Sequence, residues 1–286
     1  MQFKAAMFDF DGTITERGAY SPSKKVAFAL CDLAREIPIA FCTGRQLESF
    51  EKRGLTTLLE IIKPKDQESF LKNLFLFAEN GAIGYAFDLK KNKFKPFHKV
   101  SWPNHFINKK KLKKILSDAI KEYGEVYENA HRIVIVMRTN LHDYEDRNID
   151  DVYKLSDKIY AITVKILKKI NKNYEKFVHI GNSGIGVLVC PADGDKDAAI
   201  HCFAKFLQRK RKIKFDKNAR EILVMGDSPQ NGGNDYYFLS GKYGTPFTVG
   251  YLNKKLKLLK PVLNEKGKRL LNEKGTFHMI KSLLED

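Results

Sequence analysis

The stretch MFDFDGTIT, residues 7–15, ends an apolar run with two carboxylates, Asp9 and Asp11. The run itself, FKAAMFD from residue 3, shows no alternation of polar and apolar positions, which is typical of a strand buried on both faces of a parallel sheet. Neighbouring carboxylates at the end of such a strand are unfavourable unless their charge is compensated. A hard divalent cation is the simplest compensation, and Mg²⁺ prefers carboxylate, phosphate and water oxygens.

Further apolar strands that end in polar residues follow along the chain. We predict strands in IPIAFCTGR, LFLFAENGA, EILVMGD and PFTVG, with helices at 21–35, after residue 45, at 196–209 and at 277–284, and a short helix before PFTVG. Strands that alternate with helices indicate a parallel sheet. Ligands bind at the carboxyl edge of such a sheet. The polar residues expected to meet at that edge are Asp9, Asp11, Thr43, Lys196, Asp227 and Asp235.

The middle of the chain has a different pattern of predicted secondary structure. It contains a predicted hairpin at 87–100, helices at 109–123 and 151–171, a strand at 131–139, and a strand–turn–strand unit at 176–191. Hairpins mixed with helices are typical of an α+β module. We therefore predict an α/β protein with a Rossmann-like core formed by residues 1–84 and 191–286, and an inserted α+β domain at 85–190.

The composition is that of a globular protein, with 43% hydrophobic and 12% aromatic residues in a chain of 286. No apolar run approaches the length of about eighteen residues that a membrane span needs, and no signal peptide is recognisable. The four cysteines form no CxxC pair, and we expect them to be reduced. These features favour a soluble, cytoplasmic protein without a membrane partner.

The net charge of +17 would suit a polyanionic partner. However, the lysine runs are scattered and have little aromatic interleaving, so solvated helix faces are the preferred interpretation and nucleic acid is not the expected partner. The oligomeric state is left open by the sequence.

Four motifs carry a resemblance to a known family. The segments DFDGT at 9–13, CTGR at 42–45, GDKDAAI at 194–200 and MGDSPQNGGND at 225–235 resemble, in order, the four motifs of the haloacid dehalogenase (HAD) superfamily. The inserted module resembles the C2-type (type IIB) cap of the sugar-phosphatase-like branch, and FAENGA and GTFHMI are also similar to that branch. The resemblance implies a catalytic core and a cap domain that determines substrate specificity.

The resemblance also implies an activity: Mg²⁺-dependent hydrolysis of a sugar phosphate or a similar small phosphorylated metabolite. Asp9 would be the nucleophile that forms an aspartyl-phosphate, and Asp11 would protonate the leaving oxygen. Thr43 and Lys196 would bind the phosphoryl group. The metal ligands implied are the Asp9 carboxylate, the Asp11 backbone carbonyl and Asp227, with Asp235 either binding the metal or supporting its ligands.

Substrate contacts are expected from both parts of the chain. Gly44 and Arg45 follow the second motif in the core. In the cap, the arginines Arg132 and Arg138 suit an anionic group or sugar hydroxyls, and Asn182 and Ser183 lie in a Gly-rich turn. For Arg138 a solvent-facing strand position is the alternative, and for Asn182 and Ser183 it is an ordinary hairpin turn.

The fourth motif is longer than the common pattern, because eight positions separate Asp227 from Asp235. This GGND form resembles eukaryotic-type phosphomannomutases, so a hexose-phosphate mutase is a second hypothesis. Hydrolysis is favoured because the cap offers few arginines for a second phosphate and CTGR is more similar to the phosphatase motif. A third hypothesis is a non-catalytic binder of polyanions or nucleic acid, against which the complete set of predicted catalytic side chains argues.

Overall fold

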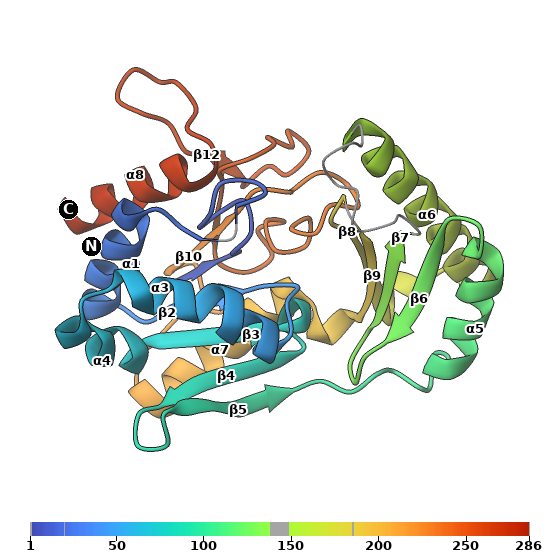
Figure 1. Cartoon of the computed structure of the whole chain (residues 1–286), viewed down its shortest axis with the longest axis horizontal. Coiled ribbons are helices and arrows are strands. Elements are labelled where there is room, and N and C mark those ends of the chain that lie inside the picture. Colours follow the sequence, from blue (N-terminus) through green and yellow to red (C-terminus); the bar gives the residue numbers. More distant parts are fainter. Residues whose placement is uncertain (1, 20, 138–148, 185, 286) are drawn as a thin grey trace. The chain divides into compact units, whose positions relative to one another are not determined.

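The computed structural model describes residues 2–19, 21–137, 149–184 and 186–285 (Figure 1). The chain forms two compact units. The first unit comprises Met1–Lys99, Lys196–Gln230 and Asp235–Asp286, and the second comprises Val100–Asp195 and Asn231–Asn234. Each unit has its own sheet and its own hydrophobic core.

The sheet of the first unit has the strand order β12-β11-β10-β1-β2-β3-β4-β5. Its parallel strands are β1 (Ala5–Phe8), β2 (Ile39–Cys42), β3 (Leu74–Ala78), β10 (Ile222–Gly226), β11 (Thr245–Thr248) and β12 (Lys260–Pro261). The chain proceeds from β1 to β2 and β3 on one side, and from β10 to β11 and β12 on the other. The order therefore reverses between β1 and β10, which is where open α/β sheets form their ligand crevice. The predicted α/β core is confirmed.

Helices cover both faces of this sheet (Figure 1). Side chains alternate along β1, so that Ala6 and Phe8 pack with α1 and α8 while Ala5 and Met7 pack with α7 on the other face. The helical elements are α1 (Lys24–Glu36), α2 (Leu47–Phe50), a π-helical turn (Glu51–Leu55), α3 (Thr56–Ile61), α4 (Pro64–Lys72), α7 (Lys196–Arg211) and α8 (Asn272–Glu285).

Helix α1 begins later than the sequence predicted. The Ser23 hydroxyl accepts a hydrogen bond from the Val26 N–H at 3.4 Å, so Ser23, and not Ser21, caps the helix. The short helix expected before PFTVG does not form, since residues 228–244 make loops and turns apart from an isolated bridge.

The hairpin predicted at 87–100 belongs, as far as Lys99, to the first unit, although the sequence assigned it to the inserted module. Strands β4 (Ile83–Asp88) and β5 (Lys93–Lys99) extend the core sheet beyond β3 as antiparallel strands. Phe97 of β5 stacks on Phe206 of α7, with ring centroids 3.9 Å apart. The division between the units therefore lies at Lys99/Val100 and not at residue 85, and residues 191–195 lie in the second unit. A hairpin at a sheet edge and a hairpin in a separate domain have the same local pattern, so the sequence could not distinguish them.

The second unit is an antiparallel sheet with helices on one face. Along β7, Ile133, Ile135 and Met137 are buried, and they share a core with residues of α5 and α6 such as Leu116 and Ile159. The strand order is β6-β7-β9-β8. The elements are α5 (Lys109–Ile120), β6 (Gly124–Glu128), β7 (Ile133–Met137), α6 (Ile149–Ile170), β8 (Val178–Asn182) and β9 (Gly186–Pro191). Strand β6 was not predicted, because its sequence GEVYE offers a single buried aliphatic side chain.

Within the described part of the chain, no helix is both long enough and apolar enough to cross a membrane.

Replacing Phe97 by alanine should destabilise the first unit. The ring packs on Phe206, Phe75 and Phe77, so its removal leaves a cavity between β5, β3 and α7 and should cost about 2–3 kcal/mol. Urea denaturation, monitored by far-UV circular dichroism, measures the loss of unfolding free energy. The control is Leu89→Ala in the exposed hairpin turn, which should change the free energy of unfolding by less than about 0.5 kcal/mol. Equal stability of the Phe97→Ala variant and wild type would contradict the placement of this hairpin in the core.

Candidate active site

A cluster of carboxylates occupies the crevice between β1 and β10. Asp9 follows β1 directly, and its N–H donates to the Met225 carbonyl of β10 at 2.8 Å. Asp9, Asp227 and Asp235 offer carboxylate oxygens that lie within 4.8 Å of one another. Asp9 is only 5% exposed and Asp235 only 1%. Three of the four acids that the sequence placed at this sheet edge are therefore brought together, whereas the side chain of the fourth, Asp11, is 52% exposed.

Lys196 lies at the centre of this cluster. It is the first residue of α7 and is completely buried. Its Nζ donates to Asp9 Oδ1 and to Asp235 Oδ1, both at 2.7 Å. One ammonium thus links the residue predicted to be the nucleophile with the last acid of the fourth motif.

Burial and mutual repulsion disturb the titration of these groups. Burial raises the pKa of Asp9 well above its usual range, Lys196 counteracts this, and the charges of Asp235, Asp227 and Asp11 add to it. Burial and Asp235 raise the pKa of Asp227 from 3.8 to about 7, against the opposing charges of Arg17 and Lys196. Although burial disfavours the ammonium, Asp235 and Asp9 raise the pKa of Lys196 well above its usual value. The cluster therefore holds more negative charge than one lysine compensates.

The donor set fits Mg²⁺. All its candidate ligand atoms are oxygens, and burial together with neighbouring carboxylates raises the pKa of Asp9 and of Asp227, an opposition to ionisation that a divalent cation would offset. Asp235 is already engaged, because its Oδ2 accepts the N–H groups of Asp227 and Ser228, both at 3.1 Å. Asp235 thereby fixes the backbone that carries Asp227. Asp9 and Asp227 are accordingly better placed than Asp235 to bind a metal directly.

Thr43 and Arg45 follow β2 and lie in the same unit. Thr43 is 1% exposed, and its Oγ1 accepts the Arg45 N–H at 3.2 Å. The Arg45 side chain forms a two-pronged ion pair with Asp11: Nε donates to Oδ2 at 3.0 Å and Nη2 donates to Oδ1. The sequence assigned Arg45 and its neighbour Gly44 to substrate binding, whereas the structure places the Arg45 guanidinium on the predicted general acid.

Two residues that support this loop were not predicted. Glu79 and Asn80 follow β3, are buried, and have φ values of 53° and 62°, which are uncommon for residues with a side chain. Their N–H groups donate to the Arg45 carbonyl at 3.0 Å and to the Thr43 carbonyl at 2.9 Å. The unusual backbone therefore fixes the positions of Thr43 and Arg45. Their position after a strand, within FAENGA, is the only sequence signal for this role.

Glycines allow close packing around Asp227. Gly12 has a φ of +79°, and a Cβ there would lie 2.8 Å from Asp227 Oδ2. A Cβ on Gly250 would overlap the Asp227 carbonyl group. The Asp227 loop can therefore approach the other loops only where side chains are missing.

Of the residues predicted to bind substrate in the second unit, Asn182 and Ser183 form hydrogen bonds with other residues of that unit. Asn182 uses its side chain within this unit: Oδ1 accepts from Ser156 Oγ at 2.6 Å, and Nδ2 donates to Asp157 at 2.8 Å. The Ser183 hydroxyl donates to the Gly186 carbonyl at 3.0 Å, as expected for a hairpin turn. Arg132 is 5% exposed. Arg138 lies outside the described residues.

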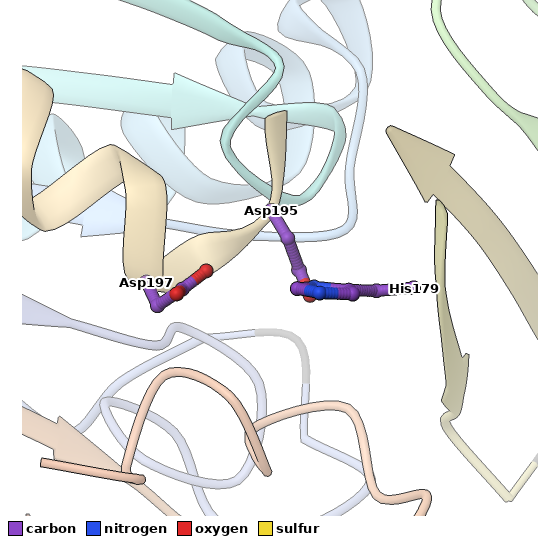
Figure 2. Close-up of side chains that lie close together, drawn as sticks. All are labelled: His179, Asp195 and Asp197. Carbon is purple, nitrogen blue, oxygen red and sulfur yellow. The ribbon is translucent and has the colours of Figure 1, made fainter. Parts of the chain in front are cut away.

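Figure 2 shows three further polar side chains, His179, Asp195 and Asp197. His179 of β8 and Asp195 belong to the second unit, and His179 Nδ1 lies 2.8 Å from Asp195 Oδ2. Asp197, in the first turn of α7, instead accepts a hydrogen bond from Lys242 Nζ at 2.8 Å within the first unit. Asp195 is thus paired with a histidine of the second unit, and Asp197 with a lysine of the first unit.

Known structures share this architecture. An N-terminally truncated, IMP-bound IMP-nucleotidase from Plasmodium falciparum matches 99% of this chain and 68% of its own, with a TM-score of 0.62 and 17% identity. The C-terminal domain of a C. albicans trehalose-6-phosphate phosphatase matches 99% and 93%, with a TM-score of 0.59 and 16% identity. A HAD/COF-like hydrolase from Plasmodium vivax matches 99% and 96%, with a TM-score of 0.61 and 14% identity.

The fold is that of the HAD-like hydrolases. No known family profile matches the sequence, and no curated protein matches it either. At these identities the likeness establishes the HAD fold alone. The match extends over almost the whole chain, so it includes the second unit as well as the first.

Gly250→Ala should disrupt the HAD crevice. The new methyl group would overlap the Asp227 backbone, which cannot rotate away as a side chain could, and the loss should be about 3 kcal/mol or more. Gly18→Ala is the matched control, because a Cβ there contacts no other atom. Its only cost is the strain of a side chain at positive φ, about 1–2 kcal/mol. Thermal and urea denaturation of both variants measure the difference. A Gly250→Ala variant as stable as Gly18→Ala would contradict the close approach.

Asp227→Asn should stabilise the metal-free protein at alkaline pH. The pKa of Asp227 is about 7 in the folded state, against an ordinary 3.8, so folding favours its protonated form. This contribution to stability is present below about pH 4 and is lost as the pH rises through 7. In EDTA, the melting temperature of the asparagine variant should therefore be a few degrees above that of wild type at pH 8 and equal to it at pH 4. A difference that does not depend on pH would refute this interpretation.

Proposed function

We propose that the protein is a phosphomonoesterase that hydrolyses a sugar phosphate or a similar small phosphorylated metabolite with the help of Mg²⁺. The observation that carries the proposal is the pair of hydrogen bonds by which buried Lys196 links Asp9 and Asp235 at the crevice between β1 and β10. A buried ion pair contributes little net stability, because the cost of desolvating its charges offsets their attraction, so its presence here favours a functional role for the lysine. The HAD fold of the chain supports a phosphoryl-transfer site at this position.

Each residue then has a step in the reaction. Lys196 binds Asp9 Oδ1, which leaves the other carboxylate oxygen to attack phosphorus while the alcohol departs. While both its oxygens accept from Arg45, Asp11 has no proton to give, so it acts as the general acid only after this ion pair opens and the carboxyl is protonated; it then donates the proton that the departing oxygen takes up. Asp11 then accepts a proton from the water that cleaves the aspartyl-phosphate, so that alcohol and inorganic phosphate are the products. Thr43 and Lys196 stabilise the charge on the phosphoryl oxygens.

Asp9 and Asp227 would hold Mg²⁺, with the Asp11 carbonyl as a further ligand and Asp235 as the support of the Asp227 loop. The cation supplies charge neutralisation at the phosphoryl group and at Asp9. Phosphoryl transfer depends mainly on positioning and electrostatics, which this arrangement provides.

We further propose that the second unit is the cap that selects the substrate, and that the reaction is hydrolysis and not mutase chemistry. The extra residues of the GGND loop, Asn231–Asn234, lie in the second unit, where the Asn182 N–H donates to the Gly232 carbonyl at 2.7 Å. The additional length thus has a structural use next to β8. The similarity of this longer loop to that of phosphomannomutases, which was the argument for the mutase, therefore does not require mutase chemistry.

Asp9→Asn should abolish turnover and preserve the fold. Asparagine keeps the shape of the side chain but cannot form the phosphoenzyme, so activity should fall below a few per cent of wild type. Phosphate release measures the loss, and thermal melting together with Mg²⁺-dependent substrate binding tests the fold. Asp118→Asn, an exposed change on α5, should keep wild-type activity. Substantial turnover by the Asp9 variant would exclude this nucleophile.

A substrate panel tests the proposed class of reaction. Phosphorylated sugars, polyols and nucleotides with Mg²⁺ should give phosphate release that EDTA abolishes. A parallel coupled assay follows mannose 6-phosphate formation from mannose 1-phosphate plus a bisphosphate activator. Isomer conversion with little free phosphate would favour the mutase. No reaction in either assay would favour the polyanion binder.

A further inference from the structure

A pocket of about 580 Å³ lies beside the carboxylate cluster, within the first unit. Asp227 and other residues of the loop after β10 form part of its wall, and the other walls come from the loop after β1, the loop after β11 and the segment that leads into α8. The pocket is therefore distinct from the Asp9–Lys196 contact but shares one residue with the metal site. Its volume is in the range of pockets that hold metabolite-sized ligands.

Two arginines give this pocket its charge. Arg17 and Arg269 both line it and are both exposed at the surface. Arg17 is near enough to Asp227 that its charge opposes the rise in the pKa of that carboxyl. One Nη of Arg269 donates to the Gly250 carbonyl, which holds the guanidinium at the pocket, and its other donors have no hydrogen-bond partner among the described residues. Among the residues that line the pocket, two are arginines and one is a carboxylate, so its lining carries more positive than negative charge.

Polar groups at the same pocket suit a phosphorylated organic ligand. Ser228 and Gln230 line it with polar side chains. A few polar groups of this kind in a pocket can bind the hydroxyl groups of an organic phosphate. Tyr251, 61% exposed, lies at the rim.

We propose that this pocket binds a second phosphate group, other than the one that is transferred, through Arg17 and Arg269. Guanidinium groups bind phosphate with two parallel hydrogen bonds, which surface lysines cannot do. The second phosphate belongs either to a bisphosphorylated substrate or to a separate phosphorylated ligand. The assignment of the transferred phosphate to Asp9 rests on the proposed function.

Binding of inorganic pyrophosphate in EDTA tests the site without turnover and without metal. Calorimetry on the full chain should show binding to wild type that weakens about tenfold in Arg17→Ala and in Arg269→Lys, as expected for the loss of a charge-assisted or two-pronged contact. The matched control, Lys266→Ala with Lys268→Ala, removes exposed charge from the same loop but not from the pocket, and should bind as wild type does. Failure of wild type to bind, or equal weakening in the lysine control, would overturn the proposal.

Two kinetic comparisons identify the source of the phosphate. If it belongs to the substrate, Arg17→Ala should lower kcat/KM for fructose 1,6-bisphosphate about tenfold more than for fructose 6-phosphate. If it belongs to a separate ligand, pyrophosphate should change the hydrolysis of p-nitrophenyl phosphate by wild type but not by Arg17→Ala. Arginine-dependent pyrophosphate binding in a protein that hydrolyses no ester would contradict the proposed function and retain this site. Ester hydrolysis without arginine-dependent pyrophosphate binding would retain the proposed function and contradict the second phosphate site.

Discussion

The ammonium of Lys196 is the contact on which the crevice of the first unit depends. It is completely buried and held between Asp9 and Asp235, which come from opposite ends of the sequence. Removing one partner would leave an uncompensated charge in the protein interior, which is far more costly than the loss of an exposed ion pair. The sheet order serves this contact, since β1 and β10 must be neighbours for Asp9 and the fourth motif to reach the same lysine.

The remaining features position loops around this charge. Asp235 holds the backbone of Asp227 and Ser228, Glu79 and Asn80 hold the loop of Thr43, and Arg45 holds Asp11. These are hydrogen bonds of side chains or unusual backbone conformations, and none of them is a feature of the hydrophobic core. The core fixes the sheet, and the polar network fixes the site upon it.

The central part of the fold was predictable, since buried parallel strands leave a continuous apolar run in the sequence, and the Asp9 strand ends at its acids. The β4–β5 hairpin was misplaced because pairing partners far apart in sequence decide whether a hairpin joins one sheet or another. The contact of Arg45 with Asp11 could not be read either, as an arginine after a strand has the same sequence signal whether it binds a substrate or a neighbouring side chain. The pocket beside Asp227 was not predicted, because Arg17 and Arg269 are brought together only by the folded chain.

The loop Asn231–Asn234 changes the topology of the insertion. The second unit is not a single excursion between two core strands, because the chain passes between the units at four places: after Lys99, Asp195, Gln230 and Asn234. Strand β8 is hydrogen-bonded to this loop through Asn182 and Gly232. A transfer of the second unit into a related protein must therefore include both of its segments, Val100–Asp195 and Asn231–Asn234. If the short segment is left behind, β8 loses its backbone hydrogen bond to Gly232.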